Sequence, residues 1–520
     1  MIGERGYASD PMMGLQSKEP ELWAEPRQLF ARIPADNPLR RLAEVLRLEF
    51  VYQEVGASYG KRGNVSVDPA VILKMMLLLF LDDVKSEREL MRIIPLRLDY
   101  LWFLGFDFDE SIPNHSVLSK ARRRWGQEVF EGLFVRTVQQ CVAAGLVEGR
   151  KLHVDASLID ANASIKSLVA GTPEGLAAIR EAFAAQNAKL EEPSEGDPSR
   201  VEPSDEDGQQ KPGGQSGEKQ SPTTLISRTD PDAAVVRHGR ERARARYKTH
   251  RAVDDQKGVI LATQTSAGDV HESHRLVELV QQSRRNLDKR RLIKTIVADS
   301  AYGTMDNFVY LATLGCVSHL GDLRSHQRNV RGEGLFGSER FRYDPRRDVF
   351  VCPSGEELKR RKFYTSRGHY EYAARAGACA ACVLRAQCTR SRVGRTLKRH
   401  PQQELLEKAR RQAHSAAAKA SRKRRAHVME GSFAQAANAH HFKRARWRGL
   451  WRQQIQDWLI AAAQNLCLLV RELAKSSPAP ENKGPGKATK GLMAAFCSIM
   501  GRSQCRWSPW ATFISFQSAS

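Results

Sequence analysis

The sequence predicts an α/β fold in which a mixed sheet is covered by helices and follows a helical N-terminal region. Two observations lead to this prediction. Residues 21–150 show helical patterns and no strand alternation. From residue 151 onward the patterns run in the order strand, hairpin, helix, strand and late helix. That order is typical of a sheet with helices packed on its faces.

The N-terminal region contains several helix signals. Asp68 and Pro69 form a good helix start, and residues 71–80 are apolar nearly all round, which predicts a buried helix. A further helix is expected from Ser86. Residues 113–125 predict another, with Asn114 or Ser116 as its cap and three arginines toward its end: Arg122, Arg123 and Arg124. This basic end predicts a DNA contact, and the alternative is the solvated face of a small bundle.

Strand signals begin abruptly at Lys151. Residues 151–160 alternate with a period of two, and Asp155 lies on the face opposite the aliphatic row. Residues 247–254 and 258–267 predict two strands joined by a tight turn. An amphipathic helix is expected at 276–287, and a β-branched strand then leads to Asp299. Residues 402–474 are expected to be helical again.

Composition limits the function classes. The 520 residues exceed one ordinary core and suggest two or three domains. Lysine and arginine total 82 against 59 acids, a net charge of +23. This surplus favours a polyanionic partner, with nucleic acid ahead of an acidic membrane surface. The longest apolar run, 71–81, is interrupted by Lys74, and no secretory signal is visible, so we expect a cytoplasmic protein without a membrane partner.

The expected domain organisation has four parts. Residues 1–20 are expected to be disordered, 21–150 to form a helical DNA-binding domain, 151–474 to form the catalytic domain, and 475–520 to be a tail without an assigned role. Two insertions interrupt the third part. The first, 162–226, contains an alanine-rich helix near 174–189 and a segment of low complexity at 191–217 that we expect to be disordered. The second, 320–400, contains short strands and a cysteine cluster.

Asp155 and Asp299 are candidate metal ligands. Each lies in or directly after an apolar strand, where an unpartnered carboxylate is costly to bury. A divalent cation would provide the partner, because Mg²⁺ prefers oxygen ligands. Two such metals about 4 Å apart can activate a water or a 3′-hydroxyl at a phosphodiester. The alternative is structural, since strand-end aspartates often cap turns or pair with arginine; we interpret Asp160, Asp254, Asp255 and Asp269 in that way.

Glu430 is the only acid among thirteen lysines and arginines between residues 408 and 452. Two interpretations remain, an ion-pair partner of Arg424 or Arg425 and a metal ligand surrounded by phosphate-binding cations, and we favour the ligand. The surrounding residues predicted to bind DNA are Arg422, Lys423, Arg424, Arg425, Lys443, Arg444, Arg446, Trp447 and Arg448. Trp451 and Trp458 are expected to anchor a helix in the core.

Four cysteines form a second constellation. Cys352 precedes a group with the spacing C-x2-C-x5-C, which comprises Cys379, Cys382 and Cys388. Four thiolates can hold a structural Zn²⁺, but only one pair has the common C-x2-C spacing, and reduced buried cysteines are the alternative. No phosphate-binding P-loop, His-Glu-x2-His helix or Gly-x-Ser-x-Gly elbow is present, which argues against ATP-driven, zinc-protease and serine-hydrolase chemistry.

Several segments together resemble bacterial insertion-sequence transposases of the DDE superfamily, the group with an InsH-type N-terminal domain. Each motif is weak alone, and their shared order over most of the chain is specific. The matching segments are 66–74 (SVDPAVILK), 113–120 (PNHSVLSK), 153–157 (HVDAS), 228–233 (RTDPDA), 297–303 (VADSAYG), 430–433 (EGSF) and 447–450 (WRGL).

The resemblance implies a ribonuclease H-like catalytic core with a metal-binding triad of Asp155, Asp299 and Glu430. It further implies Mg²⁺ or Mn²⁺, strand cleavage and strand transfer, double-stranded DNA partners (terminal inverted repeats and target), a homodimer on paired ends, and a place in the bacterial cytoplasm at the nucleoid. One departure is Ala437, seven positions after the last acid, where related transposases often carry a basic residue. The alternatives are an inactive copy, a nuclease with the same triad, and a zinc-stabilised DNA-binding protein without enzymatic activity.

Overall fold

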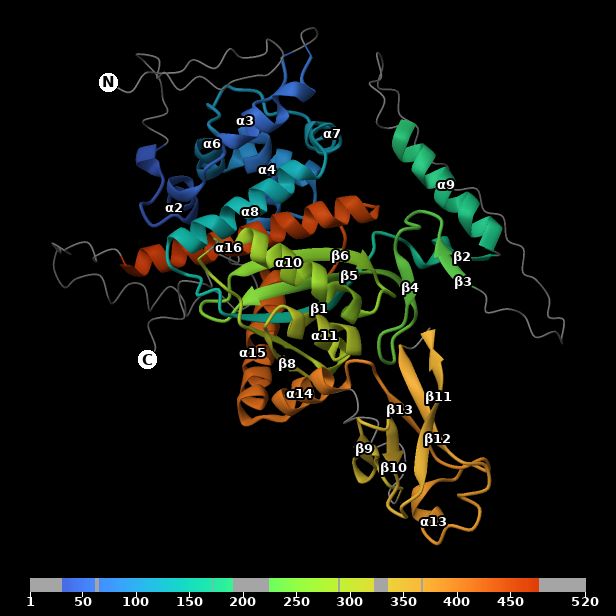
Figure 1. Cartoon of the computed structure of the whole chain (residues 1–520). Coiled ribbons are helices and arrows are strands. Elements are labelled where there is room, and N and C mark those ends of the chain that lie inside the picture. Colours follow the sequence, from blue (N-terminus) through green and yellow to red (C-terminus); the bar gives the residue numbers. More distant parts are fainter. Residues whose placement is uncertain are drawn as a thin grey trace, which may run out of the picture.

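The computed structural model describes residues 30–60, 65–171, 173–189, 224–288, 290–321, 335–365 and 368–476. The predictions for residues 1–20, 191–217 and 477–520 fall outside this part of the chain. The described residues form a helical region, a central sheet with helices on both faces, and a smaller second sheet (Figure 1). None of the described helices has the length and apolarity needed to cross a membrane.

The N-terminal region is helical, as predicted. Helix α4 begins after Asp68, whose side chain accepts a hydrogen bond from the Ala70 backbone N–H at 2.7 Å, and nearly all of its residues are buried. Before α7, whose N-cap is His115, the Asn114 side chain accepts from the Ser116 N–H at 2.9 Å. The helices are α2 (Pro38–Val45), α3 (Phe50–Val55), α4 (Pro69–Leu81), α5 (Glu87–Ile93), α6 (Leu98–Leu104), α7 (Ser116–Trp125) and α8 (Glu128–Ala143), with 3₁₀ turns η1 (Gly56–Ser58) and η2 (Ile94–Leu96).

The centre of the main sheet contains five strands in the order β6-β5-β1-β7-β8. Pairing is antiparallel from β6 through β5 to β1 and parallel from β1 through β7 to β8. This mixed sheet is compatible with a ribonuclease H-like core, and the strands predicted around Asp155 and Asp299 are confirmed. Their bounds are β1 (Lys151–Asp160), β5 (Arg244–Asp254), β6 (Ile260–Ala267), β7 (Thr295–Ala298) and β8 (Val317–Leu320).

The far edge of the sheet is built partly from the predicted first insertion. Strands β2 (Leu168–Gly171), β3 (Thr224–Ser227) and β4 (Ala234–Val236) continue the sheet beyond the beginning of β5. The predicted alanine-rich helix is confirmed as α9 (Pro173–Lys189), which projects beside β2 and β3 (Figure 1). The ends of this insertion therefore belong to the sheet. A short turn, η3 (Ile165–Ser167), precedes β2.

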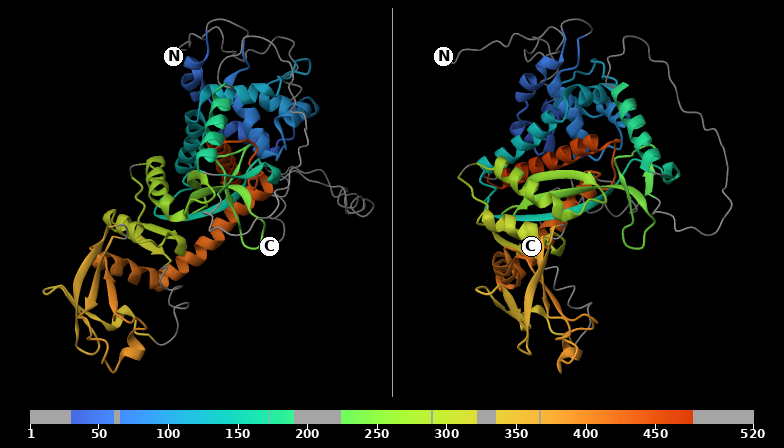
Figure 2. Two further views of the ribbon diagram at one scale, coloured as in Figure 1. Left: turned by 90° about the vertical axis from the view of Figure 1, so that its right-hand side faces the viewer. Right: turned by 45° about the vertical axis from the view of Figure 1, so that its right-hand side comes forward.

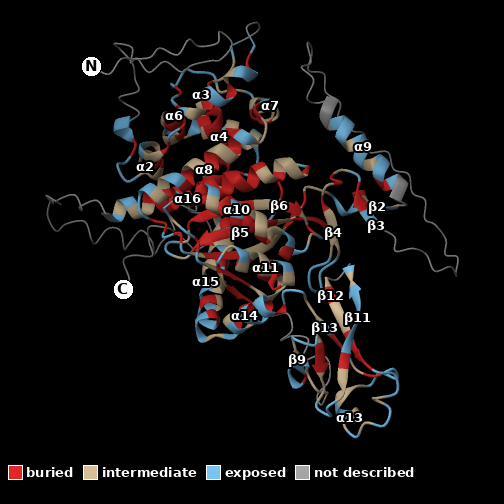
Figure 3. Cartoon of the chain, in the orientation of Figure 1, coloured by how far each residue is buried: buried red, intermediate tan, exposed pale blue. Residues whose placement is uncertain are grey.

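Helices cover both faces of the sheet. One face carries α10 (Leu276–Asn286) and α11 (Met305–Thr313); the other carries α15 (Ala416–Ala439) and α16 (Leu450–Ser476), with α14 (Gln403–His414) before them (Figures 1 and 2). Helix α16 lies between α8 and the sheet and is buried along most of its length (Figure 3). The helical N-terminal region and the sheet therefore share one continuous core.

Two aspartates of the 228–233 segment fix the start of α16. The Gly449 N–H donates to Asp230 at 3.0 Å, and the Leu450 N–H donates to Asp232 at 2.9 Å. Gly449 has a φ of +92°, which disfavours any residue with a side chain. Burial raises the pKa of Asp230 to about 6. Two segments that are more than 200 residues apart in the sequence therefore meet in one helix cap.

A fully buried ion pair joins the sheet to the same helix. Arg251 of β5 lies 3.3 Å from Asp457 of α16, and both side chains are 0% exposed. Asp457 also accepts from the Thr263 hydroxyl at 2.6 Å, and Arg251 donates to Gln464 at 2.8 Å. Burial raises the pKa of the Asp457 carboxyl and lowers that of the Arg251 guanidinium. The pair is therefore maintained by its contacts against a desolvation cost.

The predicted second insertion forms a separate five-stranded sheet in the order β13-β12-β11-β10-β9. Among the described residues its core is small and is built around Phe341, Phe350, Leu358, Tyr372, Ala374 and Leu397. The elements are η6 (Ser338–Arg340), β9 (Arg342–Asp344), β10 (Val349–Val351), β11 (Glu357–Tyr364), β12 (His369–Ala374), α13 (Arg385–Cys388) and β13 (Thr396–Arg399).

Replacing Asp457 by Ala is expected to destabilise the protein by about 3–5 kcal/mol, because Arg251 then remains buried and charged without its partner. The double variant Arg251→Met/Asp457→Leu should lose much less than the sum of the two single changes. Denaturant unfolding measures both. If the double variant lost as much free energy of unfolding as the two single variants together, this account of the pair would be contradicted.

Candidate active site

The strand register brings Asp155 and Asp299 together. Strands β1 and β7 are neighbours and run parallel, with His153 opposite Val297. Two residues further along each strand stand Asp155, in the middle of β1, and Asp299, directly after β7. Adjacent strands lie about 4.8 Å apart, so the two carboxylates must be close. The sequence prediction that these two acids form one site is consistent with this geometry.

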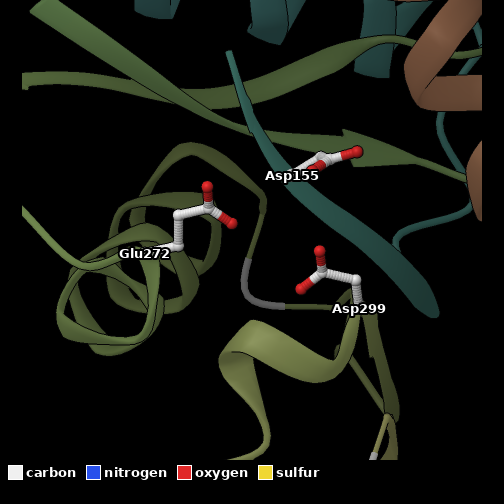
Figure 4. Close-up of side chains that lie close together, drawn as sticks. All are labelled: Asp155, Glu272 and Asp299. Atoms are coloured by element: carbon white, nitrogen blue, oxygen red, sulfur yellow. The ribbon is translucent and has the colours of Figure 1, made fainter. Parts of the chain in front are cut away.

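Glu272 is the third acid of the cluster. It begins the 3₁₀ turn η4 (Glu272–Arg275), which follows β6. One carboxylate oxygen from each of Asp155, Glu272 and Asp299 lies within 4.8 Å of the others (Figure 4). Asp299 is held by its own turn, because its side chain accepts from the Ala301 N–H at 2.9 Å at the start of η5 (Ser300–Tyr302).

Asn307 connects the segments that carry two of these acids. Its side-chain amide donates to the backbone carbonyl of Ser273 at 3.0 Å and to that of Tyr302 at 2.9 Å. Ser273 follows Glu272 directly, and Tyr302 ends the turn that begins after Asp299. Asn307 is itself buried at the start of α11. This one side chain therefore fixes the spacing between the Glu272 and Asp299 segments.

The cluster is rich in negative charge and partly buried. Burial raises the pKa of Asp155 and that of Glu272, and the neighbouring carboxylate of Asp299 raises both further. Arg425 of α15 opposes this effect, with its guanidinium 2.5 Å from the Asp155 carboxylate. Lys248 of β5 lies 3.8 Å from Glu272. Without a bound metal, the positive charges of Arg425 and Lys248 therefore face the negative charges of three carboxylates.

The donor set fits a hard divalent cation. Three carboxylates that converge on one point offer only oxygen ligands, which suits Mg²⁺ or Mn²⁺ and disfavours metals that prefer sulfur. Mg²⁺ usually keeps several waters, so two or three protein ligands are sufficient. The site that the structure assembles has the chemistry expected for phosphodiester cleavage.

Glu430 lies on α15 but does not join the cluster. Its side chain is exposed. On an ideal helix, five residues from Arg425 correspond to roughly 140° of rotation and about 7.5 Å of rise, so Glu430 points away when Arg425 faces Asp155. Its role as a metal ligand stays a prediction. Sequence reasoning missed Glu272, whose only signal was an acid in the short connection between a strand and an amphipathic helix.

Arg122, predicted to contact DNA, is instead buried in a contact between α7 and the segment before α16. It is 3% exposed, lies 2.5 Å from Glu87, and its guanidinium stacks 3.9 Å from the Trp447 ring centre. Trp447 in turn donates to Glu87 at 3.2 Å. This cluster holds α7 against the segment before α16. The correction has a simple physical cause: a paired, buried guanidinium is not available to a phosphate.

The other predicted DNA-binding residues divide by exposure. Arg446 is engaged inside the protein, where it donates to the Leu79 carbonyl at 3.1 Å, and Arg425 is engaged by Asp155. Arg422 donates to the Ala413 carbonyl at 2.8 Å, and Arg123 is half-buried. The remaining cations are exposed: Arg124, Lys423, Arg424, Lys443, Arg444 and Arg448. DNA contact by this set stays a prediction.

Lys443 is the exposed cation with a defined place beside the acids. Its ammonium donates to the Ser157 hydroxyl at 2.8 Å. Ser157 lies two residues after Asp155 on β1 and therefore points to the same face of the sheet. A phosphate near the acids would have this cation within reach.

The four cysteines gather at one end of the second sheet and are half-buried, with Cys352 after β10 and the other three between β12 and β13. Burial raises the pKa of the Cys388 thiol, and the nearby thiols of Cys379, Cys352 and Cys382 raise it further. Across the part of the chain that the structure describes, only the acidic cluster brings three ligand atoms within 4.8 Å of one another. Zinc binding by the cysteines therefore stays a prediction.

Replacing Arg425 by Gln is expected to destabilise the protein in EDTA by about 1–3 kcal/mol, since Asp155 loses its partner while Asp299 and Glu272 remain. Added Mg²⁺ should then stabilise the variant more than it stabilises the wild type. Thermal unfolding with EDTA and with Mg²⁺ measures both effects. Arg424→Gln is the matched control, because Arg424 pairs with Asp255 outside the cluster; an equal response of the two variants would contradict the assigned role of Arg425.

Two models of known protein families match this chain, and both describe transposase domains. The family described as Transposase domain (DUF772) matches residues 27–124, and the family described as Transposase DDE domain matches residues 351–470. No match to a curated protein was found. The first match covers the helices through most of α7, and the second covers the segment with Glu430 and α16. Together the two matches support an insertion-sequence transposase of the DDE type.

Proposed function

We propose that this transposase cleaves and joins DNA strands at the ends of its insertion sequence, with Asp155 and Asp299 as ligands of a catalytic divalent metal. The observation that carries the proposal is the register of β1 and β7, which places these two acids side by side. The strand order β6-β5-β1-β7-β8 supports a ribonuclease H-like core, in which the acids occupy a sheet position suited to phosphodiester chemistry.

The protein's own residues have separate tasks. Asp155 and Asp299 hold the metal and thereby orient what it binds. Mg²⁺ or Mn²⁺, when bound, activates a water or a 3′-hydroxyl and stabilises the leaving oxygen. Lys443, on the same face as Asp155, is placed to attract the scissile phosphate. The exposed cations near the start of α16 and on α15 would bind the DNA phosphates on either side of the scissile phosphate.

Glu430 remains the proposed last acid of the triad. Its support is the match of the DDE family to residues 351–470, together with its place on the helix that contacts Asp155 through Arg425. In the arrangement described, the Glu430 side chain is exposed, so the proposal requires α15 to turn when DNA binds. Such a turn would exchange Arg425 for Glu430 at the acids.

The proposed partners follow from the family. They are double-stranded DNA carrying the terminal inverted repeats, a target DNA, and a second copy of the chain that would hold the paired ends. A net charge of +23 supports a polyanionic partner. Because the substrate is chromosomal DNA, the proposed place of action is the bacterial cytoplasm at the nucleoid.

Asp155→Asn and Asp299→Asn are each expected to lower metal-dependent cleavage of a DNA fragment that carries the element's ends by more than about 100-fold, since each change removes a metal ligand. Binding of the same fragment should be unchanged. Asp269→Asn is the control, because Asp269 is an exposed acid outside the cluster.

The outcomes separate the alternatives. Cleavage without joining would favour a nuclease over a transposase. Normal binding and no cleavage by the wild type with Mg²⁺ or Mn²⁺ would favour an inactive copy or a DNA-binding protein. Normal cleavage by either asparagine variant would reject that residue as a ligand.

A further inference from the structure

We infer that Glu272 is a third metal ligand of the DNA-free enzyme and that the Tyr302 hydroxyl positions the bound metal through its waters. The inference rests on the proposed function, because it concerns the same metal. It goes beyond that function in assigning two residues outside the predicted triad. Glu272 is also outside both segments matched by the transposase families.

The geometry at Glu272 favours a ligand over a surface acid. Glu272 is half-buried, and its carboxylate converges with those of Asp155 and Asp299 within 4.8 Å (Figure 4). Its nearest described cation is Lys248, at 3.8 Å, and that ammonium already donates to the Val270 carbonyl at 2.9 Å. Three acids this close repel one another unless a cation lies between them. Arg425 reaches only Asp155 among the three.

Tyr302 supplies a second, independent observation. Its side chain is 0% exposed, and its hydroxyl has no hydrogen-bond partner among the described residues. The hydroxyl is within electrostatic range of all three acids, with Glu272 the nearest in effect. An unpaired buried hydroxyl destabilises a protein, so its presence here calls for a partner that arrives with the ligand.

A hydrated divalent cation would satisfy both observations. It would supply positive charge between the three acids, and Mg²⁺ retains waters that could bond to the Tyr302 hydroxyl. Asn307 makes the two residues act together, because it ties the backbone after Glu272 to the backbone of Tyr302. Tyr302 would therefore act through the waters around the metal, as outer partners of metal ligands do.

The first experiment measures Mn²⁺ binding to the full-length protein without DNA, by electron paramagnetic resonance of free Mn²⁺. Glu272→Gln should weaken binding at least about 10-fold. Glu278→Gln should bind as the wild type does, because Glu278 is an exposed acid on the next turn that pairs with Arg275. Wild-type affinity in Glu272→Gln would overturn the assignment of Glu272.

The second experiment separates a positioning role of Tyr302 from a structural one. Tyr302→Phe removes only the unpaired hydroxyl, so thermal stability in EDTA should stay equal or rise. Mn²⁺ affinity should nevertheless fall about 10-fold. Tyr310→Phe is the control, since Tyr310 lies outside the cluster on α11. Unchanged Mn²⁺ affinity in Tyr302→Phe would overturn the role of Tyr302.

These measurements can be distinguished from a failure of the proposed function. Metal binding is read without DNA, so it does not depend on cleavage or joining. If Asp155→Asn and Asp299→Asn lose Mn²⁺ affinity but Glu272→Gln does not, the proposed metal site stands and the inference fails. If Glu272→Gln loses affinity and the wild type never cleaves DNA, the inference stands and the proposed activity fails.

Discussion

The buried pair between Arg251 and Asp457 is the contact on which the arrangement of this protein depends. It joins the central strand β5 to the helix α16, and α16 also packs against α8 of the N-terminal region. A charged pair without solvent needs further hydrogen bonds to offset its desolvation, and Thr263 and Gln464 make two of them. The rings of Phe433 and Phe442 lie beside the Arg251 guanidinium and connect α15 to the same point.

That contact and the acidic cluster are adjacent in the sheet. Arg251 stands directly opposite Asp155 in the pairing of β5 with β1, so both side chains point to the face covered by α15 and α16. Arg251 reaches α16 through Asp457, and Asp155 reaches α15 through Arg425. One cross-strand position therefore sets the place of both late helices. The core and the acidic cluster are therefore structurally linked.

The sequence predicted strands well and side-chain environments less well. Strand β1 has the predicted bounds, because its alternation is a local property, and Asp155 and Asp299 were recognised from the same local context. Glu272 was missed because it becomes close to the other acids only through the turn after β6. Arg122 was misread because its burial depends on Glu87 and Trp447, which come from distant segments. The periodicity of apolar residues along the sequence does not report such contacts between distant segments.

The orientation of α15 about its own axis is another feature that the sequence did not predict, and it bears on the acidic cluster. A lone acid in a basic helix drew attention to Glu430, but the sequence does not say which face of the helix meets the sheet. In the structure Arg425 occupies that face and partly neutralises Asp155. A metal cation and the Arg425 guanidinium compete for the same carboxylate, so metal binding should weaken the contact that holds α15 in this orientation. The orientation of α15 therefore decides which of its side chains meets the cluster: Arg425 contacts Asp155, while Glu430 faces solvent.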